Sequence, residues 1–494
     1  MTLPVLTGIR DAWEKGAQPA MKLLIDGEWV DASDGATFAC TDPYTGREWG
    51  RFPVATDQDV DRAVRAAHRA FEEGPWRKMP AAERAAIMRK LGDLIEANLT
   101  EIALTEVREN GKLFAEMYHG GRVFASDARF FGALAETLHG YTIDKPLPGF
   151  AGWTRREPIG VVAAVTPWNT PMNLLGQKLF PAIAVGNSVV VKPSEVTPAS
   201  TLMIGALVAE AGVPPGVVNI VTGAGPVGQA LVSHPMVDKI SFTGSGATGA
   251  KIAAIAAARH ARVSLELGGK SPNIVFDDAD IDAVLAGIAS GLFSTAGQAC
   301  NAGSRILVQQ GIYDEFARRL AELARSIKWG DPLDPTTQMG PLSSRAQLSK
   351  VTSYFDCASD ERLRVVTGGE RPEHPGFFVQ PTIYADAAMD SRLLREEIFG
   401  PVAVMIPFDD EAEAIRIAND TRFGLASGVW TRDLARAHRM IEAVRAGVVW
   451  VNTYRVGTHA LPFGGFKASG IGREGGIDAL EAYTEVKSVW INLN

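Results

Sequence analysis

Residues 161–195 have the sequence VVAAVTPWNTPMNLLGQKLFPAIAVGNSVVVKPSE, in which two short apolar runs flank a segment long enough for a helix. The runs are residues 161–165 and 188–192. Runs this uniformly apolar are expected for parallel strands that helices cover on both faces. The stretch therefore predicts a strand–helix–strand unit of a parallel α/β sheet.

The same rhythm continues along the chain. Further apolar runs occupy residues 217–221, 239–242 and 262–266. Serial units of this kind predict a doubly wound sheet. A second alternation follows Ser271 and predicts a second α/β domain, with strands expected at 305–309, 401–407, 425–430 and 448–451.

The N-terminal part shows helical periodicity instead. Apolar residues recur on one face over 56–71 and 81–98, and Thr56 with Asp59 resembles an N-terminal capping pair. We therefore expect this part to be largely helical.

Two extended, half-polar segments lie outside these patterns, at 141–158 and 485–493. Lone strands leave backbone groups unpaired, so we expect the segments to pair with each other or with a neighbouring subunit, as the oligomerisation arm of a homodimer or homotetramer. The expected division of the chain is a dinucleotide-binding domain at 21–139 and 159–268, a catalytic domain at 269–470, and the arm at 140–158 and 480–494.

The composition excludes several classes of protein. Of the 494 residues, 46% are hydrophobic and 21% charged, which is enough apolar material for large cores. The formal net charge is -8 without a basic stripe, so nucleic acid is not an expected partner. The N-terminus lacks the apolar core of a secretory signal, and no segment is long enough to span a bilayer. Three cysteines fit free thiols in a reducing compartment, so we expect a cytoplasmic protein with no membrane contact.

Ligands of an open parallel sheet bind beyond the carboxyl ends of its strands, where helix N-termini present free amides. The unusual polar and glycine residues of the first domain all follow predicted strands and so share this edge: Pro167, Trp168 and Asn169; Lys192, Pro193, Ser194 and Glu195; Gly223; Gly244 and Ser245; Glu266, Gly268 and Gly269. A dinucleotide would explain such an edge.

The segment from Gly244 to Gly249 opens a helix that runs to about Ala258, so its free amides and dipole suit a pyrophosphate. Glu195 is placed to accept a hydrogen bond from a ribose hydroxyl and would repel a 2′-phosphate. This favours NAD over NADP, although Lys192 nearby weakens the inference.

A GxGxxG pattern also occurs, at Gly223, Gly225 and Gly228. It follows the third apolar run of the region rather than the first, and a tight turn explains three glycines equally well. The pattern alone does not locate the dinucleotide.

Cys300 is the candidate nucleophile. It lies in a polar, glycine-flanked loop before a predicted strand, where free amides can stabilise a thiolate and an oxyanion. Cys40 and Cys357 are interpreted as buried structural thiols. None of the eight histidines forms a metal-ligand set or pairs with Cys300, so we expect no metal and assign the base to a carboxylate.

Over essentially its whole length the chain resembles the aldehyde dehydrogenase superfamily. The resemblance is carried by several motifs in register: PWN at 167–169, KPSE at 192–195, FTGS at 242–245, ELGGK at 266–270, GQAC at 297–300, EEIFGP at 396–401 and PFGGFK at 462–467.

The resemblance implies that the protein oxidises an aldehyde to a carboxylic acid with NAD. Cys300 would attack the aldehyde, and the amides of the Asn169 side chain and the Cys300 backbone would hold the oxyanion. Glu266 would activate the water that hydrolyses the thioester. Lys178 and Glu474 match the family's proton-relay partners.

The family pattern also implies a cofactor site. Lys192 and Glu195 would contact the adenosine ribose, Ser245 the pyrophosphate, and Glu397 with Phe399 the nicotinamide ribose and ring. The whole implied set is Thr166, Pro167, Trp168, Lys192, Ser194, Glu195, Gly223, Gly228, Phe242, Thr243, Gly244, Ser245, Thr248, Leu267, Gly268, Glu397 and Phe399.

The aldehyde tunnel, placed by the same motifs, is lined by mostly small or polar residues: Thr170, Asn173, Leu174, Gln177, Ser294, Asn301, Arg455, Gly457 and His459. An apolar substrate would leave buried polar groups unpaired, at about 1–3 kcal/mol each. We therefore expect a polar or carboxylated aldehyde, with Arg455 near the tunnel mouth.

Two rival functions stay open at this point. An acylating dehydrogenase would pass the thioester to coenzyme A, but such relatives typically lack the glutamate that stands here as Glu266. A non-catalytic, dinucleotide-binding member of the family is the other rival, and the intact Cys300, Asn169 and Glu266 argue against it.

Overall fold

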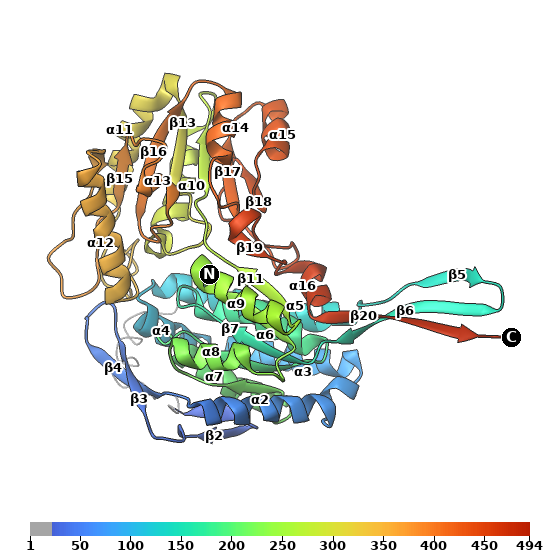
Figure 1. The fold of residues 1–494 in the computed structure, drawn as a ribbon. Coiled ribbons are helices and arrows are strands. Elements are labelled where there is room, and N and C mark those ends of the chain that lie inside the picture. The colour runs from blue at the N-terminus through green and yellow to red at the C-terminus, as the bar shows by residue number, and fades with distance from the viewer. Residues whose placement is uncertain (1–21) are drawn as a thin grey trace.

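The computed structural model describes residues 22–494. Two α/β bodies lie one above the other, and a narrow three-stranded sheet projects sideways from them (Figure 1).

The first body contains an eight-stranded sheet in the order β19-β11-β10-β7-β8-β9-β1-β2. Its five central strands are parallel and are those predicted from the apolar runs: β7 (Val161–Val165), β8 (Ser188–Lys192), β9 (Val218–Ile220), β10 (Lys239–Thr243) and β11 (Arg262–Glu266). The chain moves outward from β7 to β9 and then returns to place β10 beside β7. Loops therefore diverge between the carboxyl ends of β7 and β10, which is where ligands of such sheets bind.

Helices cover both faces of this sheet, which confirms the doubly wound prediction. On one face the apolar core includes residues of α3 (Ala81–Ala97), α4 (Leu99–Asn110), α5 (Phe114–Ala135), α6 (Pro171–Ala184), α7 (Ala199–Ala211) and α16 (Gly476–Ala482). On the other it includes residues of α2 (Asp57–Glu72), α8 (Gly225–Ser233) and α9 (Gly246–Ala258). The predicted cap of α2 is present, because the Thr56 side chain accepts a hydrogen bond from the Asp59 amide.

The prediction of a largely helical N-terminal part is wrong before residue 56. This segment forms β1 (Leu23–Ile25), β2 (Glu28–Val30), β3 (Thr37–Thr41) and β4 (Glu48–Pro53). β1 joins the first sheet antiparallel to β9, and β19 (Gly470–Ile471) joins its other edge antiparallel to β11. Strands of two or three residues are too short to show an alternating pattern, and their pairing partners lie far away in the sequence.

The second body contains a seven-stranded sheet in the order β14-β15-β16-β13-β12-β17-β18. Four strands match the predicted ones: β13 (Arg305–Gln309), β16 (Val402–Phe408), β17 (Ala426–Trp430) and β18 (Val448–Val451). Three were missed: β12 (Pro272–Val275), β14 (Arg364–Thr367) and β15 (Thr382–Ala385). Its helices are α10 (Ile281–Ile288), α11 (Tyr313–Ser326), α12 (Arg345–Asp360), α13 (Arg392–Arg395), α14 (Glu411–Asn419) and α15 (Leu434–Ala443).

The projecting sheet has the order β20-β6-β5 and consists of β5 (Thr142–Leu147), β6 (Phe150–Pro158) and β20 (Thr484–Asn492). The two segments set apart in the sequence thus pair with each other, the first of the two alternatives. β5 and β20 remain edge strands within the chain (Figure 1).

Within residues 22–494, no helix is both long and apolar enough to cross a membrane. The same part of the chain contains no cluster of histidine, cysteine and carboxylate side chains that could hold a metal ion.

Candidate active site

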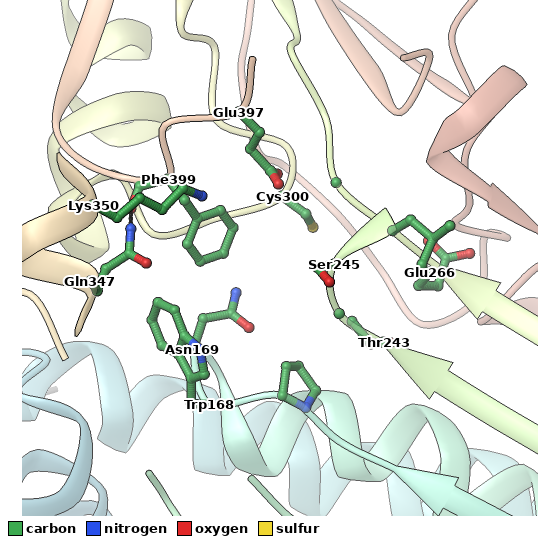
Figure 2. Close-up of a pocket in the computed structure, with 14 residues that line it drawn as sticks. Trp168, Asn169, Thr243, Ser245, Glu266, Cys300, Gln347, Lys350, Glu397 and Phe399 are labelled. Carbon is green, nitrogen blue, oxygen red and sulfur yellow. Dashed lines mark hydrogen bonds between the residues drawn. The ribbon is translucent and has the colours of Figure 1, made fainter. Parts of the chain in front are cut away.

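A cavity of about 190 Å³ lies beyond the carboxyl ends of β7, β10 and β11, and loops of the second body close it (Figure 2). Its walls are Pro167, Trp168, Asn169, Thr243, Gly244, Ser245, Glu266, Leu267, Gly268, Cys300, Gln347, Lys350, Glu397 and Phe399. The predicted nucleophile, oxyanion amide and base therefore share one cavity with many of the residues predicted to hold the dinucleotide.

The loop that carries Cys300 has an unusual backbone. Thr295, Ala296 and Gly297 all have positive φ, at 57°, 50° and 67°. The Gln298 side chain holds the loop in place, because its amide nitrogen donates to the Thr295 carbonyl and its oxygen accepts from the Ser343 amide at 2.9 Å. This conformation turns the Cys300 sulfur into the cavity, towards the space that the Asn169 amide also enters (Figure 2).

Asn169 is fixed by contacts on both sides. Its side-chain amide donates to the Gln298 carbonyl at 3.1 Å, and Asn110 donates to the Trp168 carbonyl just before it. Burial, together with the nearby carboxylates of Glu266 and Glu397, raises the pKa of the Cys300 thiol to about 12, while Arg455 and the Asn301 amide oppose the shift. The resting cysteine is therefore a thiol at neutral pH.

Glu266 ends β11 with its side chain buried, and neither carboxylate oxygen has a hydrogen-bond partner among the described residues. Burial raises the pKa of Glu266 well above its ordinary value, and the Glu474 carboxylate adds to the shift. Glu474 is paired with the buried ammonium of Lys178, which also donates to the Thr243 hydroxyl at 2.7 Å. A carboxyl group in this setting holds a proton more tightly than an exposed one does.

The opposite wall of the cavity is built from the start of α9 and a loop of the second body. The Ser245 side chain caps α9 by accepting a hydrogen bond from the Thr248 amide at 3.3 Å. Glu397 accepts from the Gly269 amide at 3.0 Å, and a Cβ on Gly268 would overlap the Glu397 carboxylate. The loop after β11 must therefore pass close to Glu397.

Two aromatic rings form the end of the cavity near the second body. Phe399 and Trp168 meet edge to face, with ring centroids 5.3 Å apart (Figure 2). Gln347 donates to the Phe399 carbonyl at 2.7 Å, and Lys350 lies one turn further along α12. Gln347 and Lys350 were not predicted from the sequence, because an amphipathic helix carries no signal that marks which of its polar residues faces a distant loop.

The remaining residues of the implied cofactor set lie beside the same sheet edge. Lys192 is buried, and its ammonium lies 3.5 Å from the Glu195 carboxylate. Glu195 also lines a cavity of about 520 Å³, together with Ser344 and Arg345. Ser194 accepts from the Val196 amide, and Thr166 and Phe242 are buried. In the glycine pattern, Gly223 has φ +143° and packs against Val227, as expected of a tight turn before α8.

A second cavity, of about 200 Å³, lies beside α6 and contains four of the predicted tunnel residues: Thr170, Asn173, Ser294 and Arg455. Two acidic residues in its walls were not predicted from the sequence. Glu106 accepts from the Met172 amide at 3.1 Å, and Glu116 accepts from the Ser294 hydroxyl at 2.8 Å.

The other predicted tunnel residues do not belong to the described walls of this cavity. Leu174 and Gln177 continue along α6, and the Asn301 carbonyl accepts from the Tyr454 hydroxyl at 2.9 Å. Gly457 is exposed, and His459 packs on Phe130 with its Nδ1 2.9 Å from the Asp127 carboxylate.

The two other cysteines are buried, as predicted for structural thiols, and Cys40 also lines the cavity of about 520 Å³ beside Glu195. Cys40 lies in β3, with its thiol 3.4 Å from the Glu195 carbonyl oxygen, and Cys357 lies in α12.

Comparison with known proteins agrees with this geometry. A model of the aldehyde dehydrogenase family matches residues 29–489. The chain belongs to this family. A betaine aldehyde dehydrogenase of Cereibacter sphaeroides is 45% identical to this aldehyde dehydrogenase, over 97% of the chain and 98% of the relative.

Solved structures of the family share the whole fold. The betaine aldehyde dehydrogenase of Staphylococcus aureus in complex with NAD+ superposes with a TM-score of 0.97 at 38% identity, and the match covers 98% of both chains. The aldehyde dehydrogenase KauB of Pseudomonas aeruginosa has the same TM-score at 39% identity and covers 100% of both chains.

Proposed function

We propose that Cys300, Asn169 and Glu266 carry the reaction of this aldehyde dehydrogenase. The enzyme oxidises an aldehyde to a carboxylic acid with NAD. The observation that supports these three roles is that all three side chains line one cavity with the N-terminus of α9. The same arrangement supports the domain division expected from the sequence, with the first sheet as the dinucleotide-binding body and the second as the catalytic body.

Cys300 would attack the aldehyde carbon as a thiolate, and the resulting oxyanion would lie between the Asn169 amide and the Cys300 backbone amide. Loss of hydride from this adduct leaves a thioester. Glu266 would take a proton from the water that hydrolyses it, and the raised pKa of this carboxylate makes it a stronger base for that step.

The chain offers groups that fit a dinucleotide. The amides at the start of α9 suit a pyrophosphate, and Glu195 at the end of β8 suits a ribose diol. Glu397 and Phe399 approach from the second body, beside Cys300. When bound, NAD supplies the hydride acceptor. The negative charge of Glu195 favours NAD over NADP.

Glu266→Gln tests the assignment of the base. The variant should still form the thioester, so rapid mixing with NAD and an aldehyde should give a burst of about one NADH per subunit followed by slow turnover. Cys300→Ala should give no burst. A Glu266→Gln variant with the steady-state rate of the unmodified enzyme would contradict the role of Glu266. Acyl-CoA formation on addition of coenzyme A would favour the acylating alternative.

We further infer that the substrate is a polar aldehyde with a carboxylate at its far end. In the second cavity, Glu116 already accepts hydrogen bonds from Ser294, Thr295 and Leu113. Burial raises the pKa of Glu106 to about 8, so this carboxyl is largely protonated at neutral pH. Arg455 donates only to the Ser290 carbonyl at 3.0 Å and, more weakly, to Ser294, which leaves guanidinium donors for an anion.

Arg455→Met tests this inference. We expect kcat/KM for succinate semialdehyde to fall about 10- to 100-fold and that for hexanal to be unchanged. Arg432→Met, which changes an exposed arginine of the second body, is the control. If hexanal or betaine aldehyde is the better substrate of the unmodified enzyme, the inference is wrong.

A further inference from the structure

Lys112 is a buried charged residue that the proposed mechanism does not use. It lies between the end of α4 and the start of α5, and its side chain is buried. Its ammonium has no hydrogen-bond partner within residues 22–494. Burying a charge without a partner is costly, and lysine is almost never fully buried unless it is paired. The position of this ammonium therefore needs an explanation.

Contacts on both sides of Lys112 fix its backbone between the two cavities. Two residues before it, the Asn110 side chain donates to the carbonyl of Trp168, which lines the first cavity. One residue after it, the Leu113 amide donates at 3.3 Å to the Glu116 carboxylate, which lines the second cavity. The side chain of Lys112 is therefore held close to the walls of both cavities.

Most of the charged groups around Lys112 belong to the second cavity. Burial lowers the pKa of its ammonium to about 8, so the group is mostly charged at neutral pH. The residues whose charges act on it are Glu116, Arg455 and Glu106 in the walls of the second cavity, and Cys300 in the first. One further titratable residue of the second cavity, His119, is exposed.

The charges around the second cavity do not balance. The Glu116 carboxylate is negative, but three hydrogen bonds already use its oxygens. Glu106 is largely protonated at neutral pH, as described above. Lys112 and Arg455 are both positive, so cations exceed anions beside this cavity. In surroundings of low dielectric constant, such an excess attracts a bound anion even without direct contact.

We propose that Lys112 is a specificity-determining residue: its positive charge behind the wall of the second cavity makes the enzyme select aldehydes with a carboxylate tail over neutral or cationic ones. The proposal rests on the proposed function above, which places that tail in the second cavity beside Arg455. Lys112 acts on the tail and not on the reacting carbon, so its effect belongs to substrate binding.

Lys112→Met tests the proposal, because methionine keeps an unbranched side chain and removes the charge. We expect kcat/KM for succinate semialdehyde to fall about tenfold, mainly through KM. The value for uncharged hexanal should be unchanged, and the value for cationic betaine aldehyde should rise. The melting temperature should not fall, because the variant no longer buries an unpaired charge.

Lys239→Met is the matched control. Lys239 is also a buried lysine with a pKa that burial lowers to about 8, but it lies in β10 and donates to the Ser264 hydroxyl at 2.7 Å. The charges that act on it do not include a residue of the second cavity. Its substitution should therefore leave the ratios of kcat/KM among the three aldehydes unchanged, whatever it does to the common rate.

A second measurement needs no variant. As pH rises through about 8, Lys112 loses its positive charge and Glu106 gains a negative one. Both changes disfavour an anion, so the kcat/KM ratio of succinate semialdehyde to hexanal should fall over this range. Ionisation of Cys300 affects both substrates and cancels in the ratio. The fall should be smaller in Lys112→Met.

The possible failures can be told apart. If Lys112→Met leaves all ratios unchanged, or lowers kcat/KM equally for the three aldehydes, Lys112 does not determine specificity and the proposal is wrong. A substrate ratio that stays constant across pH 8 in the unmodified enzyme would also contradict it. A preference of the unmodified enzyme for hexanal or betaine aldehyde would instead overturn the substrate class proposed above, on which the role of Lys112 depends.

Discussion

Cys300 combines a position suited to a nucleophile with surroundings that keep it protonated. A cysteine at its reference pKa of about 8.5 is only a few per cent thiolate at neutral pH. Here burial, Glu266 and Glu397 move the pKa of the thiol upward to about 12. A resting thiol of this kind reacts slowly with oxidants and alkylating reagents, and it becomes a nucleophile only when the negative charge around it is reduced.

Glu397→Gln should make Cys300 more reactive. A carboxylate raises the pKa of a nearby thiol and a neutral amide does not, so the pKa of Cys300 should fall. Alkylation by iodoacetamide at pH 8 should then be about two- to fivefold faster, because a larger thiolate fraction outweighs its lower intrinsic nucleophilicity. Glu396→Gln changes the neighbouring carboxylate, which pairs with Arg392 away from the thiol, and should leave the rate unchanged. A slower reaction in Glu397→Gln would contradict the electrostatic account.

At the scale of elements, the loop before Cys300 depends on glycine at one position. Gly297 has φ +67°, and a Cβ there would overlap the carbonyl of Gly400, the residue after Phe399 and part of the loop that carries Glu397. The two loops thus touch backbone to backbone beside the cavity. No side chain fits between them without moving either the nucleophile or the residues predicted to contact the nicotinamide ribose.

Gly297→Ala should therefore lower both stability and activity. The left-handed conformation alone costs about 1–3 kcal/mol, and the overlap adds to this. We expect the urea midpoint to fall and kcat to drop by about tenfold or more, because the loop must shift the Cys300 sulfur. Gly311→Ala is a control, since a Cβ at Gly311 meets open space. Unchanged kcat in a folded Gly297→Ala protein would show that the loop tolerates the shift.

The elements also show what the sequence could reveal. Central strands such as β7 and β8 were predictable, because both faces are buried and each forms a compact apolar run. β1 and β19 were not, because strands of two or three residues carry no periodic pattern. Their place in the sheet is decided by partners far along the chain.

The same limit applies to the site. Glu266 ends β11 and Cys300 precedes β13, each within a recognisable motif, so both residues could be named from local sequence. Gln347, Lys350 and Glu106 reach the two cavities from helices whose orientation depends on tertiary packing. The alternation of polar and apolar residues in β10 and β11 is visible in the sequence. The contacts of these polar residues with the region of Lys178, Glu474 and Tyr483 depend on the tertiary fold and could not be predicted.

At the scale of the whole molecule, the projecting sheet and the residues next to it carry several apolar side chains that the rest of the chain leaves exposed. The exposed ones include Tyr141, Ile143, Leu147, Val486, Trp490, Ile491 and Leu493. Ile143 and Trp490 both lie opposite Gly152 of β6, so they share one face of the sheet. Exposed edge strands and clustered apolar residues are features of surfaces that another subunit covers. We propose that this sheet is the oligomerisation arm of a homodimer or homotetramer.

The pair of substitutions Ile143→Lys and Trp490→Lys should separate the subunits. Both side chains are about half exposed in the single chain, at 50% and 55%, so lysine is tolerated by the fold but would bring charge into a subunit interface. Light scattering after size exclusion should give the mass of a 52.8 kDa monomer, where the unmodified protein gives a multiple of it. Leu434→Lys replaces an apolar residue on α15 that is 73% exposed and lies away from the arm, and it should leave the mass unchanged. If the doubly substituted protein keeps the mass of the unmodified assembly, the subunit interface lies elsewhere. If the unmodified protein is itself a monomer, the arm joins no subunits and the proposal is wrong.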